Sequence, residues 1–130
     1  MTEETSAFCP YYHRAVELIG RRWTGAILRA LLSGVQRFSD VASAIPGLSD
    51  RMLSERLKEL EAEGIVERLV RAEKPVRIDY LLTRKGRALG AVIEAVSGWA
   101  EEWAMFTLDL ASAHKPREGS AEVESVTARR

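Results

Sequence analysis

The segment that most constrains the fold is residues 49–64, SDRMLSERLKELEAEG, because its pattern predicts one helix with two unlike faces. Ser49 is a favourable N-cap residue, Asp50 suits the positive end of a helix dipole, and Gly64 favours a helix end. One face is apolar and narrow, and the opposite face is polar and carries two cations. The apolar face comprises Leu53, Leu57 and Leu60, and the polar face comprises Arg51, Glu55, Lys58 and Ala62, with Ser54 beside it. We expect this helix to pack on a core through its leucines and to offer its other side to a partner.

Three shorter helices are predicted before this segment. Apolar residues recur at helical spacing over residues 10–19 and 24–33, and Thr24 is a suitable N-cap for the second helix. Ser39 can cap a brief helix over residues 40–45, which a Pro-Gly turn then ends. The sequence therefore predicts two helices, a short helix, a tight turn and the two-faced helix, in that order.

A β-hairpin is predicted directly after Gly64. Residues 65–70, IVERLV, and residues 76–82, VRIDYLL, have the β-branched and alternating character of strands, and a polar segment containing proline joins them. In the second strand the residues divide between two faces. Val76, Ile78, Tyr80 and Leu82 are expected on one face, and Arg77 and Asp79 on the other.

A long helix is predicted after the hairpin, with Thr83 as its cap and apolar residues at three- to four-residue spacing as far as Leu110. Its apolar surface is wider than a small domain can cover, so we expect it to bind a partner. The whole order predicts a mainly α (α+β) fold: a winged helix-turn-helix with a two-stranded β-wing and added helices at both ends. We expect one domain at residues 9–110, with flexible tails at 1–8 and 111–130.

The polar face of the two-faced helix has the chemistry for reading bases in a DNA major groove. Arg51 could donate two hydrogen bonds to guanine, Ser54 could bond to either base type, and Glu55 could accept a hydrogen bond from cytosine. Ser49 and the first N–H groups of the helix could instead hold a phosphate. The chain has 19 basic and 19 acidic residues, so phosphate contacts must come from local cations rather than from net charge. Such cations gather around the hairpin and the start of the next helix: Arg68, Arg71, Lys74, Arg77, Arg84, Lys85 and Arg87.

Several short motifs occur together and in a fixed order along residues 9–104. They are Cys9-Pro10, Gly20-Arg21-Arg22-Trp23, Arg37-Phe38-Ser39-Asp40, Ile45-Pro46-Gly47, Ser49 with Met52-Leu53, Arg56-Leu57-Lys58-Glu59-Leu60-Glu61, Gly64-Ile65-Val66 and Tyr80-x-Leu82-Thr83-x-x-Gly86. As a set they make the chain resemble the HxlR-type helix-turn-helix transcriptional regulators. The resemblance implies a homodimer, paired through its N-terminal and long C-terminal helices, that binds operator DNA as a repressor or an activator. The chain departs from the family pattern at Arg21-Arg22, where glycine and lysine are more usual, and at Arg84, where proline is frequent.

The helix pattern and the resemblance together give two sets of candidate residues. The DNA-binding set is Arg37, Ser39, Ser49, Arg51, Met52, Ser54, Glu55, Arg56, Lys58, Arg71, Lys74 and Arg77. The dimerisation set is Tyr12, Val16, Leu89, Val92, Ile93, Val96, Trp99 and Trp103. The expected partners are therefore double-stranded DNA, on an inverted-repeat operator, and a second copy of the chain.

Cys9 is the only cysteine, and it precedes Pro10 at a predicted helix N-terminus with His13 one turn on. A helix dipole and a neighbouring imidazole both favour a thiolate, and some members of the resembled family use a cysteine here to sense electrophiles or oxidants. The alternative is a small buried apolar residue packed near Phe8 and Tyr11. Because no second cysteine is present, sensing would use an intersubunit disulfide or a mixed adduct.

Other classes of function have little support in the sequence. One cysteine and two histidines make no metal-binding set, and neither a phosphate loop nor a Ser-His-Asp arrangement is present, so we expect no enzyme, metal or cofactor. No apolar run approaches the roughly 20 residues of a bilayer span, and the first residues do not resemble a signal peptide, which predicts a cytoplasmic protein without a membrane partner. Two alternatives stay open: a protein–protein interaction module on the same fold, and a small-molecule effector site lined by Tyr11, Tyr12, Trp99 and Trp103.

Overall fold

The computed structural model describes residues 6–104 of the chain. Its elements are α1 (Pro10–Ile19), α2 (Thr24–Leu32), α3 (Phe38–Ala44), α4 (Asp50–Ala62), β1 (Val66–Arg71), β2 (Arg77–Leu82) and α5 (Arg84–Arg87). Residues 90–104 are also helical. The chain divides into two compact units, Met1–Ile93 and Glu94–Arg130. Most of the two predicted tails, and the predicted helical residue Leu110, lie outside the described residues.

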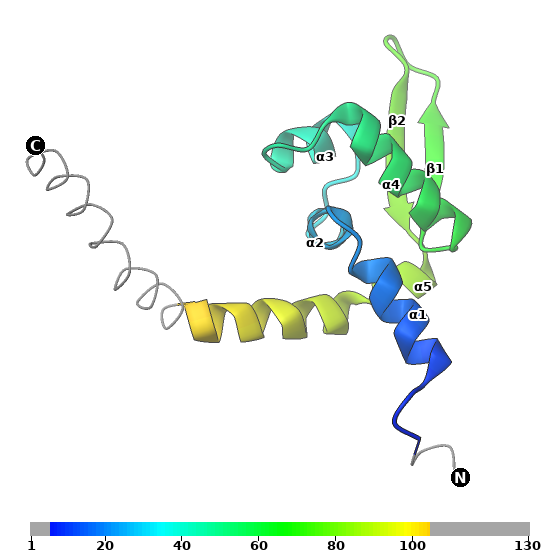
Figure 1. Cartoon of the computed structure of the whole chain (residues 1–130). Helices are drawn as coiled ribbons and strands as arrows, with labels where there is room; N and C mark the ends of the chain where they lie inside the picture. Colours follow the sequence, from blue (N-terminus) through cyan, green and yellow to red (C-terminus); the bar gives the residue numbers. More distant parts are fainter. Residues whose placement is uncertain (1–5, 105–130) are drawn as a thin grey trace, which may run out of the picture. The chain divides into compact units, whose positions relative to one another are not determined.

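The first unit confirms the predicted winged-helix fold: helices that end in a helix-turn-helix pair, α3 and α4, followed by a two-stranded sheet (Figure 1). The strands are antiparallel, with Val66 opposite Leu82 at one end and Arg71 opposite Arg77 at the other. Figure 1 shows them side by side, and the turn that joins them lies away from the helices. The backbone N–H of Tyr80 donates to the carbonyl oxygen of Gln36 at 2.8 Å, so the segment before α3 forms an isolated antiparallel β-bridge with β2, between Arg37 and Asp79.

The two-faced helix is α4, and its N-terminus, apolar face and end are as predicted. The Ser49 hydroxyl accepts a hydrogen bond from the backbone N–H of Met52 at 3.1 Å, which satisfies one of the unpaired donors of the first turn. Leu53, Leu57 and Leu60 are almost completely buried. The chain then leaves the helix through Gly64, whose φ of 76° suits a residue without a side chain. The core that holds α4 consists of Ile27, Leu28, Leu31, Val41, Ile45, Leu48, Leu53, Leu57, Leu60, Ile65, Val66 and Tyr80.

Two predicted N-caps are wrong. The N-cap of α2 is Trp23, with a left-handed φ of 78°, and Thr24 is the first helical residue, buried in the core. The N-cap of α3 is Arg37, so Ser39 lies inside the first turn. In both cases the helix begins one or two residues earlier than the nearest hydroxyl side chain suggested, and neither N-cap side chain makes a capping hydrogen bond. In α2 the burial of Thr24 in the core outweighs its preference for the cap position.

The predicted long helix after the hairpin is interrupted. Thr83 is its cap, since its hydroxyl accepts from the N–H of Gly86 at 3.1 Å, but α5 ends at Arg87 and a turn precedes the helix of residues 90–104. Helix α5 lies so close to β1 that a Cβ on Gly86 would collide with the carbonyl oxygen of Ile65. This close approach requires glycine in α5, and glycine also weakens a helix. No helix in the described part of the chain is long and apolar enough to cross a membrane.

Candidate nucleic-acid interface

The outward face of α4 carries the side chains that the helical pattern placed there. Arg51, Glu55 and Lys58 are exposed, and Ser54 is half-buried. Arg51 Nε lies 3.5 Å from Glu55 Oε2, one turn along the helix, and the arginine side chain is 89% exposed. Such an exposed pair contributes only about 0.3–0.5 kcal/mol, so Arg51 can exchange this partner for another acceptor. Lys58 makes no ion pair within residues 6–104, and its ammonium group is available for a partner.

The N-terminal candidates lie around the starts of α3 and α4. Ser39 is exposed in the first turn of α3, whereas Arg37 is half-buried beside β2. The Ser49 hydroxyl already accepts from Met52 as the cap of α4, and Met52 packs partly against the core. Ser39 and Ser49 can therefore reach a phosphate at the surface, while Met52 offers only its exposed edge.

Arg56 does not lie on the outward face of α4. Its side chain is nearly buried, its Nε donates to the carbonyl oxygen of Arg22 at 2.9 Å, and its NH1 group lies 3.1 Å from Glu59 Oε2. The helical period places Arg56 near the edge of the leucine face, and the structure places its side chain on the core side. Because its guanidinium is already occupied, we leave Arg56 out of the surface that could contact DNA.

A buried carboxylate ties two of the wing arginines together. Asp79 is completely buried; Arg71 Nε lies 2.7 Å from its Oδ2 atom and Arg77 Nε lies 2.8 Å from its Oδ1 atom. Hydrogen bonds from Arg77 and then Arg71 lower the pKa of Asp79 and outweigh the opposite effect of burial. The same contact raises the pKa of Arg77. The sequence placed Arg77 and Asp79 together on one face of the strand, but alternation along one strand cannot show that Arg71 of the paired strand converges on the same carboxylate, or that the carboxylate is buried.

Acid should weaken the fold through Asp79. A carboxyl group whose pKa is lower in the folded than in the unfolded state stabilises the fold above its unfolded pKa of about 3.9, and that stabilisation is lost as the pH falls through the folded pKa. We therefore expect the free energy of unfolding, measured by urea denaturation from pH 7 to pH 2, to fall in acid. Asp79→Asn should be less stable than the original chain at pH 7, and the difference should narrow below about pH 4. A difference that is the same at every pH would contradict this assignment.

The remaining cations of the wing region are arranged in two ways. Arg68 and Lys74 are exposed and form no ion pair in the described chain. In and beside α5, by contrast, Lys85 donates to the carbonyl oxygen of Glu63 at 2.7 Å and Arg87 donates to that of Leu82 at 3.0 Å. Among the described residues, the cations that project freely toward a partner are thus Arg68 and Lys74 of the hairpin and Arg84 at the start of α5, whereas Lys85 and Arg87 are bonded to backbone carbonyl groups.

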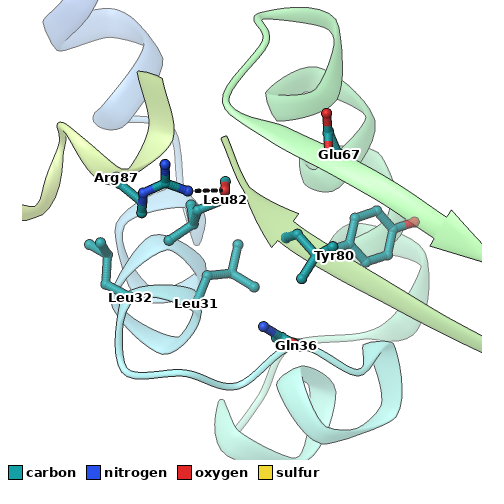
Figure 2. Close-up of a pocket in the computed structure, with 8 residues that line it drawn as sticks. Leu31, Leu32, Gln36, Glu67, Tyr80, Leu82 and Arg87 are labelled. Atoms are coloured by element: carbon teal, nitrogen blue, oxygen red, sulfur yellow. Dashed lines mark hydrogen bonds between the residues drawn. The ribbon is translucent and has the colours of Figure 1, made fainter. Parts of the chain in front are cut away.

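A pocket of about 630 Å³ opens between α2, the hairpin and α5 (Figure 2). Figure 2 shows Leu31, Leu32 and Leu82 on one side of it, with the Arg87 guanidinium bonded to the Leu82 carbonyl oxygen. The lining also includes Gln36, Glu67, Tyr80 and Leu81. Among the described residues there is no group of three side chains suited to hold a metal ion. This pocket therefore presents an apolar wall with isolated polar groups.

Cys9 is exposed and is the N-cap of α1, where its Sγ accepts a weak hydrogen bond from the backbone N–H of Tyr12 at 3.5 Å. The alternative of a buried apolar residue is therefore wrong for the single chain. The His13 imidazole contacts other residues than the Cys9 thiol: its Nε2 atom lies 3.4 Å from Glu17 Oε2, and its ring centre lies 5.3 Å from that of Phe8. Cys9 is thus a thiol at a helix N-terminus that reagents can reach.

The candidate dimerisation residues separate into two groups. Leu89 and Ile93 are half-buried and pack against the core of their own unit, which accounts for their apolar character. The others leave large apolar side chains in solvent. Tyr12 is 71% exposed and Trp99 66%, and Val16, Val92, Val96 and Trp103 are exposed by 40–57%.

Comparison with known proteins gives a consistent result. Residues 18–107 match the model of a family described as HxlR-like helix-turn-helix. The chain is 52% identical over 98 residues to YvaP of Bacillus subtilis, an uncharacterised HTH-type transcriptional regulator, with 75% of this chain and 91% of YvaP covered. It is 45% identical over 98 residues to the HTH-type transcriptional regulator YodB of the same organism, with 75% of this chain and 88% of YodB covered.

Solved structures agree with these sequence relatives. Diamide-treated YodB from B. subtilis matches with a TM-score of 0.63 and 45% identity, over 75% of this chain and 97% of that one. The redox regulator HypR in its reduced form matches with a TM-score of 0.70 and 30% identity, over 76% of this chain and 98% of that one. A quinone-bound structure of YodB matches with a TM-score of 0.63 and 43% identity, over 73% and 99% of the two chains.

Proposed function

Because the chain belongs to the HxlR-like helix-turn-helix family of transcriptional regulators, we propose that it binds an inverted-repeat operator as a homodimer, with α4 in the major groove. The observation that carries the proposal is the division of α4 into two faces. Its leucines are buried, while Arg51, Glu55 and Lys58 are exposed at the positions from which side chains reach base edges. A helix that docked on another protein would more often present aromatic anchors on this face.

The wing and the helix starts complete the proposed surface. Arg68 and Lys74 are free to contact phosphates, and Arg71 and Arg77 keep their terminal N–H groups for the same purpose, because Asp79 occupies only the Nε atoms. Phosphate contacts fix the register of the protein on DNA, and base contacts select the sequence. We therefore propose that α4 selects the base sequence, and that the hairpin, Ser39 and Ser49 orient the protein on the DNA.

The dimer is proposed from the apolar side chains that each unit leaves exposed. On α1 these include Tyr12 and Val16, and beyond Ile93 they include Val96 and Trp99. Exposed apolar surface of this kind marks protein interfaces. A twofold dimer would present two copies of α4 to half-sites that are inverted and about one helical turn of DNA, roughly 10 base pairs, apart.

Selection of bound sequences from random DNA tests the proposal directly. With purified full-length chain we expect recovery of an inverted repeat with half-site centres about 10 base pairs apart, and light scattering should give the mass of a dimer. Recovery of a single half-site by a monomer would contradict the dimer, and failure to enrich any sequence would contradict operator binding.

We also propose that modification of Cys9 changes operator affinity. The thiol is exposed at the N-terminus of α1, a helix that belongs to the proposed dimer surface, and the relative YodB has been solved after diamide treatment and with a bound quinone. Addition of the Cys9 thiolate to an electrophile such as diamide or a quinone would attach that group at this surface. Attack on a disulfide would break its S–S bond, release one thiolate and leave a mixed disulfide on Cys9. Where the attached group is a hydrazine from diamide or a thiol, the Cys9 thiolate of the second subunit could displace it as the leaving group and so join the two subunits through an S–S bond.

Diamide treatment should therefore change operator affinity at least about tenfold, a coupling of roughly 1.4 kcal/mol, and Cys9→Ser should remove the response while it keeps the affinity of the untreated chain. Non-reducing mass analysis identifies the adduct, and gel-shift titration measures the affinity. Unchanged affinity of a chain with Cys9 fully modified would exclude sensing at this residue.

A further inference from the structure

We propose that Arg56 is a positioning residue for base reading: without touching DNA, it fixes the rotation of α4 about its own axis and thereby directs Arg51 to its base. The inference rests on the proposed DNA-binding function and adds a residue from the core side of the helix. It gives a role to a cation that the leucine face of α4 would not otherwise require.

The contacts of Arg56 join α4 to the linker between α1 and α2. Its Nε donates to the Arg22 carbonyl oxygen at 2.9 Å, and its NH1 group lies 3.1 Å from Glu59 Oε2. Glu59 in turn lies 3.4 Å from an NH2 group of Arg21. Two consecutive residues of the linker are therefore bound, one through its backbone and one through its side chain, to one turn of α4.

The same linker also contacts the turn that precedes α4. Trp23 has a φ of 78°, which is uncommon for a bulky residue, and its Cη2 atom lies 3.5 Å from the place that a Cβ would occupy on Gly47. The guanidinium of Arg22 lies 5.1 Å from the centre of the Trp23 ring and covers it. The linker thus contacts both the turn before α4 and the middle of α4. The contacts of Trp23 with Gly47 and Arg22 maintain its left-handed backbone conformation.

The leucines of α4 cannot define its rotation as sharply as these polar contacts do. Burial of apolar surface is non-directional, so Leu53, Leu57 and Leu60 determine which side of the helix is buried but tolerate small rotations. A hydrogen bond, by contrast, is directional: its donor angle prefers values above about 150°, and the bond weakens steeply below about 120°. Base reading requires side chains to be held within about 0.5 Å and 10–20° of their productive geometry. Arg56 supplies such a directional contact on the buried side of α4, and rotation of the helix about its axis would break its hydrogen bonds to Arg22 and Glu59.

The test is a cycle of four proteins: the original chain, Arg51→Ala, Arg56→Met and the double variant. Methionine keeps a long apolar stem in the buried site and removes every donor. For each protein, affinity is measured for the selected operator and for an operator changed at the base that Arg51 reads. In the original background Arg51→Ala should lower discrimination about tenfold or more. In the Arg56→Met background the same change should lower it less than about threefold, because the two effects are coupled.

Several outcomes decide the proposal. The proposal is overturned if Arg51→Ala lowers discrimination about tenfold in the Arg56→Met background as well. It is also overturned if Arg56→Met weakens binding equally on all DNA sequences, which would make Arg56 a direct phosphate contact. If circular dichroism shows that Arg56→Met does not fold, Arg56→Lys replaces it, because lysine keeps a buried cation but cannot bond to Arg22 and Glu59 in the same fork. We then expect the Arg51 penalty to fall at least about twofold, and an unchanged penalty overturns the proposal. If the original chain selects no operator, the proposed function fails, and this inference fails with it.

Discussion

Shortening Leu57 to alanine is expected to lower the free energy of unfolding by about 2–5 kcal/mol. The Leu57 side chain is completely buried between α4 and the rest of the core. Its removal loses the transfer free energy of three carbon atoms and leaves a cavity that a well-packed core closes only in part. Urea denaturation followed by circular dichroism measures the change.

The matched control for Leu57→Ala is the next residue. Lys58→Ala should change the free energy of unfolding by less than about 0.5 kcal/mol, because Lys58 is exposed and forms no ion pair in the described part of the chain. Lys58→Ala should nevertheless weaken DNA binding, whereas folded Leu57→Ala protein should retain its sequence preference. Equal losses of stability for both variants would show that α4 does not divide into the two faces described above.

Arg51→Ala is expected to reduce discrimination at one base position of the operator by about 1–3 kcal/mol, or roughly 5- to 150-fold in affinity. Arg51 is 89% exposed on the outward face of α4, and its only described partner is the exposed carboxylate of Glu55. A guanidinium can donate to two acceptors of one guanine at once, which a truncated side chain cannot replace. Fluorescence anisotropy with operators changed one base pair at a time measures the discrimination.

Arg51→Lys separates charge from base reading. It keeps the positive charge but lacks the planar fork, so binding to unrelated DNA should change little while discrimination at the same base pair falls. If Arg51→Ala weakens binding equally on every sequence, Arg51 contacts the DNA backbone and does not read a base.

The features of α4 that the sequence predicts correctly are those with a local cause. The period of Leu53, Leu57 and Leu60 defines a buried face, and Ser49 and Gly64 mark the ends of the helix by capping chemistry that involves only adjacent turns. The hairpin follows for the same reason, because alternation and β-branching act within each strand. The sequence alone therefore locates the proposed base-reading face.

The features that could not be predicted depend on contacts between distant parts of the chain. Asp79 is buried because Arg71 lies on the paired strand, and Arg56 is buried because the Arg22 carbonyl oxygen, 34 residues away, accepts its hydrogen bond. The left-handed Trp23 and the short α5 likewise depend on neighbours beyond their own segment, Gly47 and Ile65. Neither a helical wheel nor strand alternation contains this information.

The buried carboxylate of the hairpin also determines how the proposed complex responds to salt. Arg71, Arg77 and Asp79 together carry one net positive charge rather than two. With phosphate contacts from Arg68 and Lys74 as well, each wing of the proposed complex would displace about three condensed cations from DNA rather than four, and would add about −2.7 to the slope of log K against log salt concentration. In return, the two tethered arginines lose little rotational freedom when they meet phosphates. Asp79 thus reduces the entropy gained from counterion release, and it also reduces the side-chain entropy that Arg71 and Arg77 would lose on binding.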